Sequence, residues 1–330
     1  MRTRILGKNL SVSAVGLGCM GMSHAYGDPS SHKDMSELIA LAVDLGCSYF
    51  DTAEVYGTPE NPHDNEELVG KALKGLRNKV AIGTKCGISF DYSTTDTRKP
   101  MIHDARPETI LRSCEDSLKR LQTDHIDLYY LHRLDPSTPV EVVAETMARL
   151  IDQGKILNWG LSEVTEKTIR KAHAVCPLTA IQNRYSMMAR HYEPLFPVLE
   201  ELGIGLVAYS PMANGLLSGA YGKGSTFNAA TDYRSVMPQF TDEAMDKNRD
   251  LFALLAQTAE RHGATPAQIS MAWMICKKPW IVPIPGTRKP ERLRENLAAA
   301  DVLLSAEEVA AIDKALDTME MSEVFGGVRK

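Results

Sequence analysis

Short apolar runs alternate with longer stretches of helical periodicity along most of the chain. Eight of these runs are rich in Val, Ile and Leu and are apolar on both faces, which is typical of buried parallel strands. The predicted strands cover Ala14–Cys19, Tyr49–Asp51, Val80–Lys85, Ile126–Leu131, Asn158–Ser162, Ala180–Asn183, Gly205–Ser210 and Ile281–Ile284.

Helices are predicted between these runs, because apolar residues recur at spacings of three and four and several segments open with a capping residue or Pro. Such alternation predicts a parallel sheet with crossover helices, closed as a barrel or left open as a doubly wound sheet. The strand count favours the barrel modestly. The predicted helices cover Asp34–Leu45, Pro107–Leu121, Pro139–Gln153, Thr165–Val175, Glu193–Leu202, Thr265–Lys277 and Lys289–Ala300.

Four segments lie outside this repeat. Arg4–Ser13 predicts a β-hairpin that turns at Gly7-Lys8, and Ala213–Phe240 predicts a long polar loop of the kind that is usually functional. Asp242–Gly263 and Ser305–Leu316 predict two extra helices. With no linker or low-complexity tract, we expect a single α/β domain over residues 1–330: a (β/α)8 TIM barrel with an N-terminal β-hairpin and two extra helices.

Composition narrows the function classes. The 330 residues are 44% hydrophobic and 24% charged, as in an ordinary globular protein. The net charge of -5 and the lack of a long basic run argue against nucleic-acid partners. Six scattered cysteines without a C-x-x-C pair indicate reduced thiols. No apolar stretch resembles a signal peptide or a membrane span, so we expect a cytoplasmic protein without membrane partners. The sequence does not specify its oligomeric state.

One motif invites a dinucleotide-binding interpretation. Gly16–Gly21 satisfies G-x-G-x-x-G after a predicted strand. In a Rossmann unit these glycines open a helix directly, whereas here the turn-forming segment Gly27–Ser31 intervenes. A glycine-rich strand end that admits a ligand is the better interpretation.

Polar side chains gather at three successive strand ends. Asp51 ends the second predicted strand and Tyr56 follows it, while Lys85 ends the third and His132 the fourth. Each residue also has a purely structural interpretation, as a cap, a loop tyrosine, a surface ion pair or a core histidine. The carboxyl ends of barrel strands meet at one face, however, so we expect the four to converge.

This set has the chemistry that carbonyl reduction needs. The reaction requires a proton on oxygen, and a free tyrosine is a weak acid with a pKa of about 10. An ammonium lowers that pKa, so Lys85 is expected to tune Tyr56, with Asp51 fixing Lys85. His132 is expected to orient the substrate oxygen by hydrogen bonding.

From Gly16 to Asn296 the chain resembles the aldo-keto reductase family. The resemblance rests on Phe50–Gly57, Gly83-Thr84-Lys85 and Tyr130-Leu131-His132. It implies an enzyme that reduces an aldehyde or ketone, with Tyr56 as the acid. It also implies an NADPH/NADP+ cofactor that lies extended across the barrel mouth without a Rossmann domain.

By the same resemblance, Ser162 and Gln182 bind the nicotinamide carboxamide and Tyr185 stacks on its ring. Glu163 stands where the family usually has Asn, which removes one carboxamide contact. The segment Tyr209–Leu217 resembles the loop near the pyrophosphate. Its expected cofactor residues are Ser210, Pro211, Met212, Gly215 and Leu217.

A Gly-Thr pair before a predicted helix is an anion site, and the basic side chains around it suit a 2′-phosphate. By resemblance Arg292 meets the phosphate, while Arg288 replaces the Lys that the family often has at Gly286. The expected residues of this segment are Gly286, Thr287, Arg288, Arg292, Glu295 and Asn296.

Substrate is expected beside the four polar residues, with His24, Tyr26 and Met187 as walls of its pocket. Two alternatives stay open. One is an NADPH-binding regulatory subunit with little turnover. The other is a metal-dependent hydrolase or isomerase, which needs more His and carboxylate ligands at the strand ends than Asp51 and His132. We expect no metal and a small carbonyl compound as the binding partner.

Overall fold

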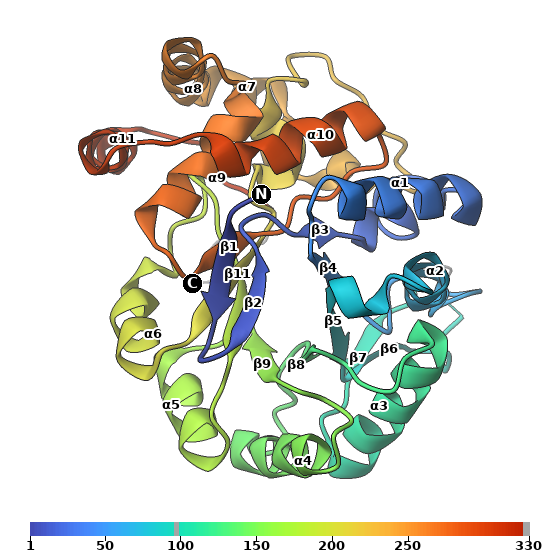
Figure 1. Ribbon diagram of the computed structural model, residues 1–330. Coiled ribbons are helices and arrows are strands. Elements are labelled where there is room, and N and C mark those ends of the chain that lie inside the picture. Colours follow the sequence, from blue (N-terminus) through green and yellow to red (C-terminus); the bar gives the residue numbers. More distant parts are fainter. Residues whose placement is uncertain (96–98, 326–330) are drawn as a thin grey trace.

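The computed structural model describes residues 1–95 and 99–325. Eight parallel strands form one curled sheet in which each strand pairs with the next strand of this sheet along the chain. Figure 1 looks along the barrel and shows helices as a ring around these strands. The strands are β3 (Leu17–Gly18), β4 (Tyr49–Asp51), β5 (Ala81–Cys86), β8 (Leu128–Leu131), β9 (Trp159–Ser162), β10 (Ala180–Arg184), β11 (Gly205–Tyr209) and β12 (Ile281–Pro283).

Backbone hydrogen bonds between the first and last strand segments close the barrel. The Gly16 N–H donates to Pro283 O at 3.0 Å, and the Gly18 N–H donates to Pro285 O at 3.2 Å. The two segments come this close because glycine has no side chain: a Cβ on Gly18 would lie 2.8 Å from Ile284 O. The glycine-rich strand end therefore closes the barrel, and the (β/α)8 fold predicted from the alternation is confirmed.

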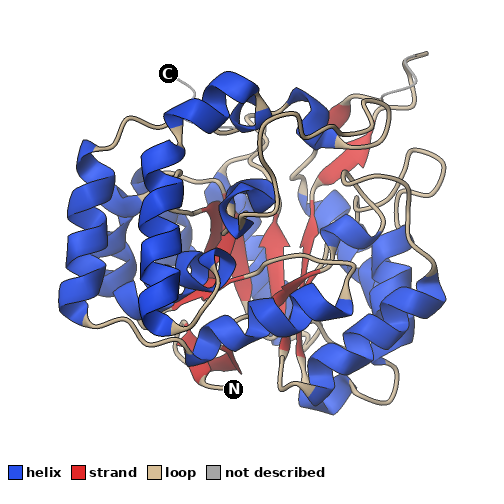
Figure 2. Ribbon diagram, turned by 90° about the horizontal axis from the view of Figure 1, so that it is seen from above, coloured by secondary structure: helices blue, strands red, loops and turns tan. Residues whose placement is uncertain are grey.

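The helices cover the outside of the barrel, as the side view in Figure 2 shows. All seven predicted helices are present, and two segments were missed: α2, and a small hairpin of β6 (Ile88–Phe90) and β7 (Met101–His103). The predicted extra helix after the long loop is two helices, α7 and α8. The helices are α1 (His32–Asp44), α2 (Asp64–Leu73), α3 (Pro107–Leu121), α4 (Val140–Asp152), α5 (Glu166–Val175), α6 (Phe196–Leu202), α7 (Asp242–Lys247), α8 (Arg249–His262), α9 (Pro266–Lys277), α10 (Pro290–Ala298) and α11 (Ala306–Thr318).

Side chains along the strands alternate between the barrel interior and the helix layer. Tyr49, Tyr130 and Ala180 pack with one another in an inner cluster. Their chain neighbours Phe50 and Tyr129 belong to the larger outer cluster between strands and helices. This period of two, which pleated strands impose, decides which residues at each strand end face the mouth of the barrel.

The N-terminal hairpin covers the end of the barrel opposite that mouth. Its strands β1 (Thr3–Leu6) and β2 (Leu10–Ser13) pair antiparallel, as predicted. Leu6, Leu10 and Val12 pack into the inner cluster, and Figure 1 shows the hairpin crossing the barrel end. The hairpin therefore fills the amino-terminal end of the barrel with apolar side chains.

Gly18→Ala is predicted to destabilise the protein by about 1–3 kcal/mol, because the added Cβ must displace backbone where the barrel closes. Urea unfolding measures the loss. Gly222→Ala is the matched control, since a Cβ there meets nothing within 4 Å. Equal stability of the two variants would contradict this account of closure.

Candidate active site

A buried ion pair lies at the carboxyl ends of β4 and β5. Side chains alternate between the two faces of a strand, and Asp51 and Lys85 each lie two residues beyond an inward-facing position of the same strand. Both side chains therefore face the barrel interior. Lys85 Nζ donates to Asp51 Oδ1 at 2.6 Å and to Thr52 O at 2.6 Å. Gln182 Nε2 donates to Asp51 Oδ2 at 2.7 Å. The Lys85 side chain is fully buried, so these oxygens hold its ammonium in one place.

Tyr56 and His132 complete the group. Lys85 Nζ lies 4.8 Å from the centroid of the Tyr56 ring. The His132 ring meets that ring edge-on, with 5.7 Å between the two centroids. The loop that carries Tyr56 is fixed by Ser23 Oγ, which donates to Tyr56 O at 2.9 Å. The four side chains that the sequence singles out therefore lie together at the barrel mouth.

Burial controls the protonation of this group. It raises the pKa of Tyr56, although the Lys85 ammonium acts in the opposite direction. The expected net lowering is thus reversed, because the phenol is buried. Burial and Lys85 together hold the pKa of His132 well below its usual range, so the imidazole is neutral. For Lys85, burial favours the neutral amine, but Asp51 and Tyr56 outweigh it and raise the pKa.

Glu163 fixes the loop at the end of β9. Its backbone has a positive φ of 58°, a conformation that Asn adopts more readily than Glu. The Glu163 carboxylate accepts from the Arg184 N–H at 3.0 Å and from the Tyr192 hydroxyl at 2.8 Å. The departure from Asn therefore provides an acceptor that fastens neighbouring chain segments. Ser162 accepts a hydrogen bond from Arg133 Nη1 at 2.9 Å.

The stacking role expected for Tyr185 is wrong. Tyr185 lies an odd number of residues, three, after the inward-facing Gln182. Its side chain therefore points to the opposite face, into the helix layer. Its ring has no exposed surface and stacks on Trp273 of α9, with 5.3 Å between centroids. Tyr209, at the end of β11, instead packs against the inner cluster and is partly exposed at the mouth. Counting alternation from Gln182 in the sequence would have excluded Tyr185.

A family model described as the Aldo/keto reductase family matches residues 14–317. The chain belongs to the aldo/keto reductase family. It is accordingly an NADP-dependent oxidoreductase of a family that generally uses NADP(H) and acts on small carbonyl compounds.

Curated relatives cover nearly the whole chain. A probable aldo-keto reductase 1 of Glycine max is 40% identical over 323 residues, which are 97% of this chain and 89% of that protein. The aldo-keto reductase str7 of Strobilurus tenacellus is 38% identical over 330 residues, which are 97% of this chain and 93% of that protein.

Solved structures share the fold. The glycerol dehydrogenase AKR11B4 from Gluconobacter oxydans superposes with a TM-score of 0.86 at 28% identity, covering 99% of this chain and 98% of that one. The thermostable aldo-keto reductase Tm1743, in complex with the inhibitor epalrestat, has a TM-score of 0.75 at 31% identity, with 95% and 99% covered. The aldo-keto reductase AKR11C1 from Bacillus halodurans, in its holo form, has a TM-score of 0.76 at 27% identity, with 95% and 96% covered.

In this aldo/keto reductase the segment after β11 is tightly folded. Ser210 has a positive φ of 52° and Gly215 one of 98°. The N–H groups of Gly215 and Leu217 donate to Met212 O at 3.0 and 3.1 Å, and Ser270 Oγ donates to Pro211 O at 3.1 Å. The Leu217 side chain is fully buried, so any cofactor contact from this residue is through its backbone.

The long loop 213–240 reaches across to the loop after β3. Tyr26 forms a backbone bridge with Asp232, and Asn214 Nδ2 donates to the Tyr26 hydroxyl at 2.7 Å. His24 lies against Tyr56, with 6.0 Å between ring centroids and 16° between ring planes. Met187 is 1% exposed within the outer cluster, so its expected role as a pocket wall is wrong.

The loop after β12 and the start of α10 carry the residues expected at the 2′-phosphate. Gly286 is exposed, and Thr287 Oγ1 accepts from the Lys289 N–H at 3.1 Å. Arg288 donates to Gly21 O and, at 2.8 Å, to Asp28 O, so it joins the loops after β12 and β3. Arg292 is half-buried on the first turn of α10. Further along this helix Glu295 is half-buried and Asn296 is buried.

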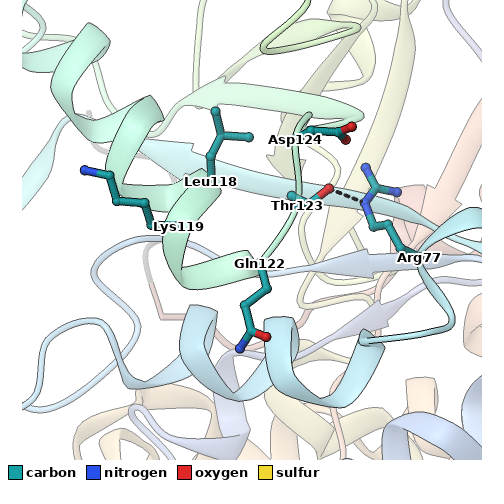
Figure 3. Close-up of a pocket in the computed structure, with 6 residues that line it drawn as sticks. All are labelled: Arg77, Leu118, Lys119, Gln122, Thr123 and Asp124. Carbon is teal, nitrogen blue, oxygen red and sulfur yellow. Dashed lines mark hydrogen bonds between the residues drawn. The ribbon is translucent and has the colours of Figure 1, made fainter.

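Features away from the mouth suggest no second site for this chemistry. Figure 3 shows a shallow hollow near the amino ends of β5 and β8, where Arg77 Nε donates to Thr123 Oγ1 at 2.9 Å. Within residues 1–95 and 99–325, no group of His, Cys, Asp or Glu is placed to hold a metal ion, so the metal-dependent alternative lacks a ligand set there. No helix in that part of the chain is both long and apolar enough to cross a membrane.

Glu54 is a site residue that the sequence interpretation missed. It lies within the Asp51–Gly57 motif and is buried. Glu54 Oε1 accepts from the Gly87 N–H at 2.8 Å, and its own N–H donates to Lys85 O at 3.2 Å. The loop of Tyr56 is thereby tied to the strand of Lys85. Burial, with a contribution from Glu66, raises the pKa of Glu54 to about 7.

Glu54→Gln is predicted to stabilise the protein at pH 8 more than at pH 5. With a native pKa of about 7 against an ordinary 4.5, Glu54 holds its proton in the folded state and loses it on unfolding. As the pH rises from 5 to 8, the free energy of unfolding of the wild type therefore falls relative to that of the variant by about 2–3 kcal/mol. Urea unfolding at both pH values measures it. The exposed Glu60→Gln is the control, and a constant difference for Glu54→Gln would refute the assignment.

Proposed function

We propose that this aldo/keto reductase reduces an aldehyde or ketone to an alcohol, with Tyr56 as the proton donor. The observation that carries the proposal is the buried Lys85 ammonium, held by Asp51 at 2.6 Å and lying 4.8 Å from the Tyr56 ring. The reaction adds a hydride to the carbonyl carbon and a proton to its oxygen. The products are the alcohol and NADP+.

Each residue has one task in this proposal. Tyr56 stays protonated through the neutral range because burial raises its pKa, so it has a proton to give. As that proton leaves, the Lys85 ammonium stabilises the phenolate. Neutral His132 donates a hydrogen bond to the carbonyl oxygen, a contribution of roughly 3 kcal/mol where charge develops. Asp51 and Gln182 keep the ammonium in position.

NADPH, which supplies the hydride when bound, fits the polar groups at the mouth. Among the described residues, His132 Nδ1 and Arg288 Nη2 are buried without a hydrogen-bond partner. A bound ligand can provide the missing partner for each nitrogen. Gln182 uses its Nε2 on Asp51 and keeps its Oε1 for the carboxamide, next to Ser162. Tyr209 takes the ring-stacking role in place of Tyr185.

The phosphates are assigned to the two loops that follow β11 and β12. The residues in these roles are Ser210, Pro211, Met212, Gly215, Leu217, Gly286, Thr287 and Arg288, with Arg292 at the start of α10. Glu295 and Asn296, further along α10, are assigned to the adenine side. His24 and Tyr26 stay as predicted walls of the substrate pocket. The gathered tetrad, and the structural similarity to a glycerol dehydrogenase, support turnover over the regulatory-subunit alternative. The cytoplasmic location stays a prediction.

Tyr56→Phe is predicted to lower kcat for a generic aromatic aldehyde by about 10²–10⁴-fold, because the variant keeps the ring and loses the proton. Fluorescence titration is expected to show nearly intact NADPH binding. Tyr92→Phe, at an exposed tyrosine, is the control and keeps the parental rate. Parental turnover by Tyr56→Phe would show that another group donates the proton.

Arg292→Ala is predicted to raise the Kd for NADPH by about 10–100-fold and to change the Kd for NADH much less, because only NADPH carries the 2′-phosphate. Arg294→Ala on the same helix is the matched control, since Arg294 is exposed and has no assigned role. Equal losses of affinity for NADPH and NADH in Arg292→Ala would contradict the assignment of the 2′-phosphate to this residue.

A further inference from the structure

Two guanidinium groups lie at the barrel mouth without an acidic partner. Arg184 ends β10, two residues beyond Gln182, so it faces the interior. Arg133 follows His132 directly. In the described part of the chain neither arginine forms a salt bridge, whereas several other arginines there pair with Asp or Glu. Two positive charges therefore stand beside the catalytic residues, and among the described residues neither is bound by a carboxylate.

The Arg184 guanidinium is also short of hydrogen-bond acceptors. Its Nε and Nη1 atoms are buried and, among the described residues, have no partner. The Arg184 Cζ lies 5.4 Å from the centroid of the Tyr209 ring and 5.8 Å from that of Phe325. The two aromatic rings flank the guanidinium, and its Nε and Nη1 atoms are shielded from water. Buried charged donors without acceptors are costly, so this group is arranged to receive an acceptor from a ligand.

Glu163 contacts Arg184 but forms no salt bridge with its guanidinium. Its two carboxylate oxygens accept from neutral donors, the Arg184 backbone N–H at 3.0 Å and the Tyr192 hydroxyl at 2.8 Å. Glu163 thus positions the backbone of Arg184 and leaves the Nε and Nη1 atoms of its guanidinium without an acceptor. One carboxylate against two guanidiniums leaves this part of the mouth positive, in a chain whose net charge is -5.

Arg133 brings positive charge close to the reacting atoms. Its Nη1 donates to His132 O at 2.6 Å and to Ser162 Oγ at 2.9 Å. After burial and Lys85, Arg133 is the next cause that lowers the pKa of His132. Arg133 follows β8 and Arg184 ends β10, whereas the phosphate-binding segments proposed above follow β11 and β12. The charge therefore lies away from the proposed phosphate sites and beside the proposed nicotinamide position, where the carbonyl substrate must also bind.

We propose that the carbonyl substrate carries a carboxylate and that Arg184, assisted by Arg133, binds it. The inference rests on the proposed function and names the substrate class for that site. Guanidinium groups bind carboxylates through strong charge-assisted hydrogen bonds. Arg184 and Arg133 together hold the substrate carboxylate at Arg184, while the carbonyl oxygen of the substrate reaches Tyr56 and His132.

The first experiment compares 4-formylbenzoate with 4-formylbenzamide, two aldehydes of equal size of which only the first carries a charge. The wild type is expected to prefer the acid in kcat/KM. Arg184→Met is expected to lower the acid-to-amide ratio of kcat/KM by roughly tenfold or more, mainly through the KM of the acid, and Arg184→Lys to restore part of it. The exposed Arg249→Met is the matched control and keeps the wild-type ratio.

A second measurement separates this inference from the proposed function. Benzoate and benzamide are titrated into the wild type and Arg184→Met with NADP+ present, and binding is followed by calorimetry. Benzoate is expected to bind more tightly to the wild type, less so at high salt, and to lose this advantage in Arg184→Met. If benzoate binds in this way but neither aldehyde is turned over, the reductase proposal is wrong and the carboxylate site is still supported.

Two outcomes overturn the inference. In one, the wild type shows no preference for the charged member of either pair. In the other, Arg184→Met weakens both aldehydes equally and raises the Kd of NADPH, which would assign Arg184 to a cofactor phosphate.

Discussion

The ion pair between Lys85 and Asp51 is the interaction on which the site depends. Both groups are buried, and each is satisfied only because β4, β5 and β10 bring together a carboxylate, a backbone carbonyl and the Gln182 amide. Removing one partner would strand a buried charge, at about 3–5 kcal/mol. A closed barrel is what makes this arrangement possible, since its strands deliver these groups to one rim.

Two neutral groups stand around that fixed charge. Burial keeps the phenol of Tyr56 and the imidazole of His132 uncharged, the first through a raised pKa and the second through a lowered one. A positive charge beside a protonated phenol favours the phenolate that remains after proton transfer. Burial makes Tyr56 a weaker acid before the reaction. The same burial also strengthens the electrostatic interaction between the Lys85 ammonium and the phenolate. Arg133 and Arg184 extend this positive region toward the substrate.

Strand order and the convergence of Asp51, Tyr56, Lys85 and His132 could be predicted from the sequence, because apolar runs and the motif residues at their ends are local signals. The helix α2 was missed because its first turn is charged and His63 before it gives no side-chain cap. Tyr185 was misassigned because motif similarity was followed without counting the alternation from Gln182. The lack of an acceptor at Nε and Nη1 of Arg184 depends on where Glu163, Tyr192 and Tyr209 lie, which no local sequence pattern contains.

A crystal structure of the protein with NADP+ would test the central claim most directly. The account predicts the Tyr56 hydroxyl within hydrogen-bond reach of Lys85 Nζ, and the nicotinamide C4 beside them with room for a carbonyl group at about 3–3.5 Å. A nicotinamide bound elsewhere on the barrel, or a Tyr56 hydroxyl turned away from Lys85, would contradict it.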